Sequence, residues 1–193
     1  MDDRLRAAES IVFDVGNVLL RFDPKAVCSL LPQKLREPFY HSLFVLKNWA
    51  PVDSGLIPQK QVAQHAADEA GMPEEAHWVL YLFEHFHEVM TPMPLYRMIP
   101  ELRQCGKRLF ALTNYPQPSF SYALQAFPLL QTLDGILVSS EEKLVKPDLR
   151  IFRLAEQRFS LDPAKTLFID DTLINVQGAL AAGWNGWHYT PEG

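Results

Sequence analysis

The second half of the chain alternates short apolar runs with amphipathic segments of helical spacing, and this alternation restricts the possible folds more than any other feature. The apolar runs read as buried strands, and a similar run stands near the N-terminus. The expected strands cover residues 10–13, 108–112, 135–139, 166–169 and 184–189. Expected helices begin near residues 95, 148 and 174. Repeated strand–helix units build a parallel sheet with helices on both faces, so we expect an α/β fold, a Rossmann-like doubly wound sheet.

Residues 22–91 interrupt the alternation and carry no strand signal. Two helices are expected within this segment, over residues 59–70 and 73–90. Prolines at positions 92 and 94, and the stretch 22–24, are typical of the connections that lead out of one unit and back. We therefore expect two domains: an α/β core of residues 1–21 and 92–193, and a cap of residues 22–91, called the helical insert below.

The composition excludes several classes of protein. With 193 residues, 48% of them hydrophobic and 21% charged, the chain has the make-up of a soluble globular protein. A net charge of −5 without a basic stripe argues against a nucleic-acid partner. No apolar run is long enough to span a bilayer, and the N-terminal MDDRLRAAES is too polar for a signal peptide. Cys28 and Cys105 stand in apolar stretches and are expected to be reduced core residues. These features predict a cytoplasmic protein with no membrane partner, a monomer or weak homodimer.

Polar side chains follow three of the expected strands at the point where each strand ends. Asp14 follows the first strand, Thr113 and Asn114 follow the second, and Asp170 and Asp171 follow the fourth. Because the carboxyl ends of parallel strands meet at one edge of a sheet, where ligands bind, these residues are expected to lie together. The Asp170–Asp171 pair also precedes an apolar helical segment, and capping that helix is the alternative role.

Three acids at one edge would repel each other unless a cation lies among them, and Mg²⁺ fits a few carboxylates with substrate phosphate oxygens. An Asp beside such an ion can attack phosphorus and form an aspartyl-phosphate. Lys146, just ahead of the helix that begins near residue 148, would offset the charge as a compact cation. The Thr113 hydroxyl and nearby backbone N–H groups would hold phosphate oxygens.

Four motifs carry a resemblance that covers nearly the whole chain. They are FDVGNVL at Phe13, LTN at Leu112, VKPD at Val145 and FIDDTLINVQGA at Phe168. Their content and order resemble the haloacid dehalogenase-like hydrolase superfamily. The DxGNVL form with a small helical cap is similar to the branch that includes bacterial α-D-glucose-1-phosphate phosphatase.

The resemblance implies a role for each matching residue. Asp14 would be the nucleophile and a ligand of Mg²⁺, together with Asp171 and the backbone carbonyl of Gly16. Asp170 would act on the metal through water or orient Lys146. Phosphate would be bound by residues that include Thr113, Asn114 and Asn17. For Asn17, shaping the turn is an equally good interpretation, and Asn175 either bonds back to the site or is structural.

Gly16 departs from the family pattern. Most phosphatases of the superfamily have a second Asp there, two residues after the nucleophile, as general acid and base. The backbone carbonyl still allows metal binding, but proton transfer to the leaving group lacks its usual donor. Such side-chain catalysis contributes roughly 10²–10⁴-fold. Turnover is therefore expected to be slower, or limited to good leaving groups, unless a cap residue or a water takes over.

These features predict a magnesium-dependent phosphatase acting on a small phosphorylated metabolite, such as a sugar phosphate. A dehalogenase that uses Asp14 to displace halide is the first alternative, because a departing halide needs no proton. A catalytically weak binding or regulatory protein is the second. Within the insert, Trp49 and Lys47 lie where a cap could reach the site, as does Arg21 just before it.

Overall fold

The computed structural model describes residues 2–190, and a five-stranded sheet lies at its centre. All four pairings in this sheet are parallel, in the order β5-β4-β1-β6-β7. The strands are β1 (Ser10–Phe13), β4 (Arg108–Thr113), β5 (Gly135–Val138), β6 (Thr166–Asp170) and β7 (Asn185–His188). The register places Phe13 beside Ala111 and Ile169, so Asp14 and Asp170 leave neighbouring strands side by side.

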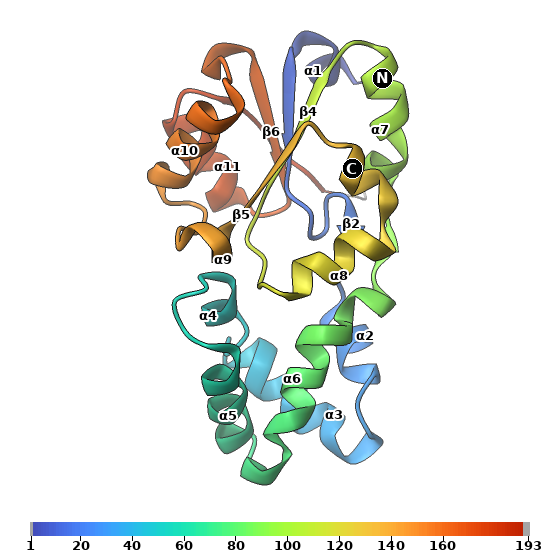
Figure 1. The fold of residues 1–193 in the computed structure, drawn as a ribbon, viewed down its shortest axis with the longest axis vertical. Helices are drawn as coiled ribbons and strands as arrows, with labels where there is room; N and C mark the ends of the chain where they lie inside the picture. The colour runs from blue at the N-terminus through green and yellow to red at the C-terminus, as the bar shows by residue number, and fades with distance from the viewer. Residues whose placement is uncertain (1, 191–193) are drawn as a thin grey trace.

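Side chains of the central strands alternate between two apolar layers, as the two-residue period of a strand requires. Val12, Phe110 and Phe168 belong to one buried cluster, which includes residues of α10 and α11. Ile11 and Phe13 belong to the other, which includes residues of α1, α7 and α8. Helices cover both faces (Figure 1), and the expected doubly wound α/β fold is confirmed.

Three of the longer helices that cover the sheet begin close to the expected positions near residues 95, 148 and 174, whereas α8 was not expected from the sequence. The longer ones are α7 (Pro94–Gln104), α8 (Ser119–Ala126), α10 (Leu149–Phe159) and α11 (Leu173–Ala181). The short ones are α1 (Asp3–Ala7), α9 (Ser139–Glu142) and two 3₁₀ turns, Pro128–Thr132 and Pro163–Lys165. Asp148 caps α10 by accepting a hydrogen bond from the Arg150 N–H at 2.9 Å, so the segment with Lys146 ends at a defined helix start.

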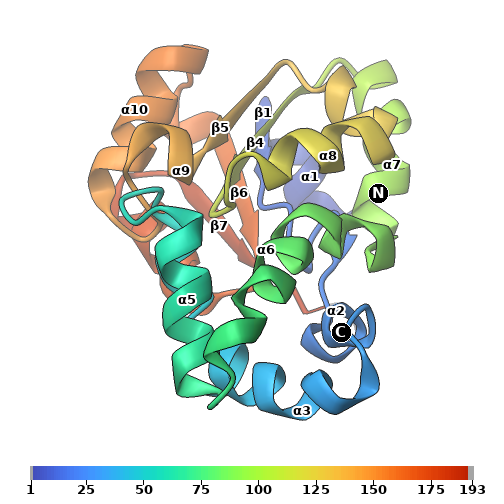
Figure 2. The ribbon, with the colours of Figure 1, turned by 60° about the horizontal axis from the view of Figure 1, so that its bottom comes forward.

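The helical insert lies at the carboxyl edge of the sheet, as Figure 2 shows. The chain enters and leaves it through an antiparallel pair, β2 (Leu20–Arg21) and β3 (Thr91–Pro92). Its α-helices are α2 (Pro24–Ser29), α3 (Gln33–Tyr40), α4 (Ala50–Asp53), α5 (Gln59–Glu69) and α6 (Ala76–His85). A π-helical turn, His41–Val45, follows α3, and 3₁₀ turns, Pro73–Glu75 and Phe86–Val89, flank α6. The expected single helix over 73–90 is therefore wrong, since only its middle part is α-helical.

One apolar cluster runs from Leu35 and Phe39 of the insert to Ile11 and Phe13 of the sheet. The division into core and cap domains therefore stays a prediction. Within residues 2–190, no helix combines the length and apolar character needed to cross a membrane. Cys28 is buried as expected, but Cys105 is exposed, so a core position for Cys105 is wrong; it follows the last turn of α7 and faces solvent.

Candidate active site

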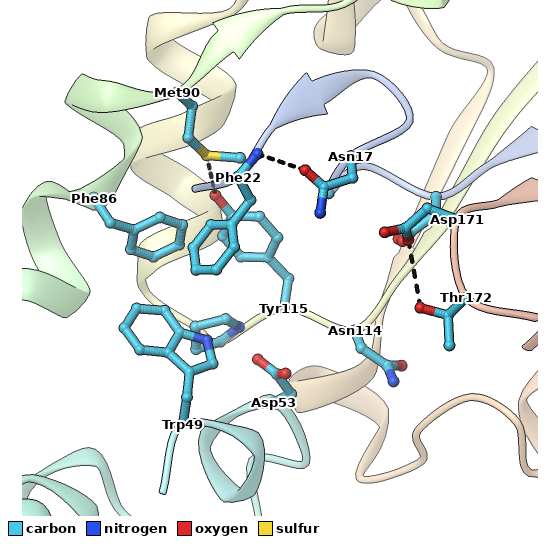
Figure 3. A pocket seen from close by; sticks show the side chains of 13 residues that line it. Asn17, Phe22, Trp49, Asp53, Phe86, Met90, Asn114, Tyr115, Asp171 and Thr172 are labelled. Carbon is cyan, nitrogen blue, oxygen red and sulfur yellow. Dashed lines mark hydrogen bonds between the residues drawn. The ribbon is translucent and has the colours of Figure 1, made fainter. Parts of the chain in front are cut away.

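A pocket of about 220 Å³ lies where the helical insert meets the carboxyl edge of the sheet (Figure 3). The loops after β1, β4 and β6 supply one side of it, and the insert supplies the other. Its lining residues are Asp14, Gly16, Asn17, Phe22, Trp49, Asp53, Phe86, Met90, Asn114, Tyr115, Pro116, Asp171 and Thr172. Of the strand-end residues expected to converge, Asp14, Asn114 and Asp171 line this pocket together with residues of the insert, whereas Thr113 and Asp170 are buried and do not line it.

Lys146 joins two of the strand-end acids. Its Nζ lies 2.9 Å from Oδ1 of Asp14 and 2.6 Å from Oδ2 of Asp170. The side chains of Lys146 and Asp170 are fully buried. Burial alone would lower the pKa of Lys146, but the two carboxylates outweigh it and hold that pKa above its ordinary value. Lys146 is therefore a buried ammonium group held against the predicted nucleophile.

Both carboxylate oxygens of Asp170 accept hydrogen bonds. Besides Lys146, it accepts from the Thr172 N–H at 2.8 Å and from Nδ2 of Asn175 at 3.2 Å on each oxygen. Asp170 thus orients Lys146 and also closes the turn before α11 (Leu173–Ala181), which has Thr172 as its N-cap and no side-chain cap, so the expected capping role is wrong. Asn175 bonds back to the site, which was one of its two expected roles. A direct bond from Asp170 to metal stays a prediction.

The carboxylates of Asp14, Asp170 and Asp171 form a compact acidic cluster, with one oxygen of each within 4.8 Å of the others. Burial, and then the charge of Asp170, raises the pKa of both Asp14 and Asp171, although Lys146 acts in the opposite direction on each. A cation among them would relieve this repulsion. The hard oxygen donors fit Mg²⁺, which Asp14, Asp171 and the Gly16 carbonyl would hold.

The expected phosphate-binding residues differ in how much of their hydrogen-bonding capacity is already used. The Thr113 hydroxyl is buried and has no hydrogen-bond partner among the described residues. Asn114 forms two hydrogen bonds with the backbone of Lys146, donating to its carbonyl at 3.1 Å and accepting from its N–H at 2.9 Å. Asn17 has a φ of 53° and accepts from the Phe22 N–H at 2.9 Å. Of these three side chains, that of Thr113 has no hydrogen bond among the described residues, and phosphate binding by all three stays a prediction.

The sequence profile of haloacid dehalogenase-like hydrolases matches residues 9–183. The chain belongs to this family. The expected family and the expectation that the chain is a hydrolase are therefore confirmed.

Similar proteins within the family include both phosphatases and dehalogenases. The sesquiterpene phosphatase astK of Aspergillus oryzae (strain ATCC 42149 / RIB 40) is 24% identical over 183 residues, covering 94% of this chain and 90% of that protein. The (S)-2-haloacid dehalogenase 1 of Pseudomonas sp. (strain CBS-3) is 26% identical over 120 residues, covering 62% of this chain and 53% of that protein. The comparison therefore supports a hydrolase but does not distinguish cleavage of a phosphate ester from cleavage of a carbon–halogen bond.

Solved structures of haloacid dehalogenase family enzymes share the whole fold. Enzyme bt-2542 from Bacteroides thetaiotaomicron has a TM-score of 0.76 at 18% identity, covering 97% of this chain and 96% of that chain. The same enzyme in complex with magnesium and inorganic phosphate has a TM-score of 0.72 at 19% identity, covering 96% of each chain. The helical insert is included in this likeness, because so little of either chain is left out.

In this haloacid dehalogenase-like hydrolase, one wall of the pocket is aromatic. The rings of Phe22 and Trp49 lie 5.6 Å apart, those of Trp49 and Phe86 5.2 Å, and those of Phe86 and Tyr115 5.3 Å. Met90 completes the wall, and the Tyr115 hydroxyl donates to its sulfur at 3.4 Å. Phe86 both packs within the insert and lines the pocket.

Asp53, the last residue of α4, is a polar residue of the pocket that the sequence did not single out. Its Oδ1 is buried without a hydrogen-bond partner among the described residues. Burial raises the pKa of Asp53 well above its usual range; the charge of Asp14 adds to this and that of Lys146 opposes it. Of the three residues expected near the site, Trp49 lines the pocket, whereas Arg21 and Lys47 are exposed and do not line it.

Proposed function

We propose that this hydrolase is a magnesium-dependent phosphatase that cleaves a small phosphomonoester through an aspartyl-phosphate on Asp14. The observation that carries the proposal is the buried Lys146 ammonium, bonded to Asp14 and Asp170 beside the carboxylate of Asp171. A dianionic phosphate needs such local positive charge, and the acids beside it suit a divalent cation. The relative astK is a phosphatase, and bt-2542 is known in complex with magnesium and inorganic phosphate, which adds support.

The reaction would proceed in two displacements at phosphorus. A carboxylate oxygen of Asp14 attacks, the new O–P bond forms, and the ester P–O bond breaks with its electron pair going to the leaving alcohol. Water then attacks the phosphorus, which releases phosphate and regenerates the Asp14 carboxylate. Bound Mg²⁺ would offset the negative charge of the phosphate and the acids. Lys146 would stabilise the negative charge that returns to Asp14 when water displaces the phosphate, and the Thr113 hydroxyl would donate to a phosphate oxygen.

The aromatic wall supports an alcohol with apolar surface over the sugar phosphate expected from sequence resemblance. Rings and a thioether offer contact area but few partners for the several hydroxyls of a sugar. Among the lining residues of the insert, Asp53 is the polar exception. The relative astK is a sesquiterpene phosphatase, whose name points to an apolar alcohol for that protein. We therefore propose a phosphomonoester of an apolar or aromatic alcohol as the substrate class.

A haloacid dehalogenase is the second candidate function, and Gly16 is the observation that favours it. The position two residues after Asp14 has no acidic side chain, and displacement of halide requires none. The relative from Pseudomonas is a haloacid dehalogenase. Against this candidate, the acidic cluster suits a cation that halide displacement does not use.

The deciding experiment measures phosphate release from sugar, alkyl and aryl phosphates, and halide release from haloacids, with Mg²⁺ or with EDTA. We expect phosphate release only with Mg²⁺, and none from Asp14→Asn. Glu69→Gln is the matched control, because Glu69 is an exposed acid of the insert that does not line the pocket. Halide release that persists in EDTA would favour the dehalogenase. Failure to hydrolyse any phosphomonoester, together with no magnesium-dependent binding of beryllium fluoride, would refute the phosphatase and favour a regulatory protein.

A further inference from the structure

The loop after β1 leaves an open space where a catalytic acid could stand. A β-carbon built on Gly16 meets no atom within 4 Å. Its neighbours do not replace the missing acid, since Val15 is buried and the Asn17 amide oxygen already accepts from Phe22. The acids of the sheet edge, Asp14 among them, belong to the charged cluster around Lys146. A proton donor for the leaving alcohol therefore has to come from outside the strand-end loops.

Asp53 reaches the same pocket from the opposite side. Figure 3 shows its side chain near those of Trp49 and Asn114, in a pocket that Asp14 also lines. Its buried Oδ1 has no hydrogen-bond partner among the described residues. A buried carboxyl oxygen without a partner costs about 1–3 kcal/mol or more, and a ligand that pairs with it removes that cost. The side chain is thus placed to meet a polar atom of a bound substrate.

The backbone of Asp53 is anchored to the core beside the phosphate-binding loop. The Ser139 hydroxyl donates to the Asp53 carbonyl at 2.5 Å and accepts from the Tyr115 N–H at 3.0 Å. Two residues later, the Gly55 carbonyl accepts from Nζ of Lys143. Ser139 therefore connects the backbone of the insert acid to the loop that follows Thr113. This connection fixes the backbone of Asp53 beside the loop of the predicted phosphate site.

We infer that Asp53 is the general acid that protonates the leaving alcohol, in place of the carboxylate that is missing at Gly16. The inference rests on the proposed phosphatase function. As the ester P–O bond breaks, the Asp53 carboxyl gives its proton to the alcohol oxygen and becomes a carboxylate. In the second step it takes a proton from the attacking water, whose other proton stays on the released phosphate.

The charges around Asp53 agree with this role. Burial, with the Asp14 carboxylate, raises the pKa of Asp53, against the charge of Lys146. Tyr115 lines the same pocket, and the pKa of its phenol is raised first by burial and then by the charge of Asp53. Carboxylic acids that act as catalytic acids near neutral pH commonly have their pKa raised in this way, by burial and by a neighbouring carboxylate.

The test compares two aromatic substrates that differ in their need for a proton. The leaving group of p-nitrophenyl phosphate departs without help, whereas that of benzyl phosphate requires an acid. In Asp53→Asn we expect kcat/KM, which reports the first displacement alone, to fall roughly 10²–10⁴-fold for benzyl phosphate and less than about tenfold for p-nitrophenyl phosphate. Glu69→Gln, which also neutralises one acid of the insert, should match the wild type on both substrates.

Each other outcome has a defined meaning. Equal losses of kcat/KM on both substrates, or no loss on either, would overturn the role of Asp53 while the phosphatase function stands. A wild type that releases phosphate from neither substrate would overturn the phosphatase function itself. If Asp53→Asn does not fold, the wild type alone decides: a shallow dependence of kcat/KM on leaving-group pKa across aryl and alkyl phosphates supports the acid, and a steep one refutes it.

Discussion

Replacing Lys146 by methionine removes the cation from a buried three-residue cluster while keeping a side chain of similar length. The Lys146 and Asp170 side chains are fully buried, and that of Asp14 is 12% exposed. Removing one partner of a buried ion pair costs roughly 3–5 kcal/mol, because the remaining charge is left uncompensated. Lys146 pairs with two acids, so we expect a loss near the upper end. A domain's free energy of unfolding is typically about 5–15 kcal/mol, so the loss would be a large share of it.

Urea unfolding in EDTA measures this loss of stability and shows how much of it comes from the pairing of Lys146 with Asp170. Wild type, Lys146→Met, Asp170→Asn and the double variant form one thermodynamic cycle. The double variant should be more stable, by roughly 0.5–3 kcal/mol, than the sum of the two single losses predicts. In Lys146→Met the Asp170 carboxylate is left without its cation, whereas in the double variant a neutral amide takes the place of that carboxylate. Added Mg²⁺ should restore part of the stability of Lys146→Met, since a bound cation also offsets Asp14 and Asp171.

An exposed ion pair supplies the matched control. Lys165 lies 2.8 Å from Glu9, with 53% and 64% of the two side chains exposed, so Lys165→Met should leave the urea midpoint unchanged. The reasoning is refuted if Lys146→Met loses less than about 1 kcal/mol, the range of surface pairs. It is also refuted if the losses of the two single variants simply add, because the cluster would then not behave as one unit.

Three further predictions concern single residues of the site. In EDTA, the free energy of unfolding of the wild type should fall relative to that of Asp14→Asn as the pH rises from about 4 to 7. The pKa of Asp14 is raised from 3.8 to about 7, so in this range the folded state keeps a proton that the unfolded chain releases. Urea unfolding at several pH values checks this. Gly55→Ala, at φ +62° against the Ser140 carbonyl, should lose roughly 1–3 kcal/mol in urea unfolding and lower benzyl phosphate turnover. Thr113→Val should weaken inorganic phosphate binding roughly 10–100-fold by calorimetry without loss of stability.

The sheet and its polar edge could be predicted because they follow from local patterns. Strands that are buried on both faces read as continuous apolar runs, and Ser10–Phe13 matches its expected limits. Because parallel strands share one carboxyl edge, Asp14 and Asp171 were expected to share a site before any distance was known. The fold brings Lys146 to Asp14. Its pairing with Asp14 was indicated by the VKPD motif more than by its distance from Asp14 along the chain.

The helical insert was less predictable, because its structure depends on packing between segments distant in the sequence. Residues 73–90 have a helical apolar stripe, yet only Ala76–His85 is α-helical and 3₁₀ turns replace its ends. Phe86 leaves the α-helix at its C-cap and joins Trp49 and Tyr115 in the pocket wall. Propensity and periodicity describe a helix in isolation, whereas these ends are set by tertiary contacts.

Asp53 shows why the site could not be completed from sequence. The helix α4 has four residues, Ala-Pro-Val-Asp, which is too short to show a period. The backbone at Asp53 and Gly55 is held by Ser139 and Lys143, which follow these two residues by 86 and 88 positions in the chain. An acid at position 16 would be carried by the same loop as Asp14, whereas the position of Asp53 depends on how the insert sits on the sheet. If Asp53 is the proton donor, these two contacts act on the chemistry, because they place the acid only when the insert is seated over the nucleophile.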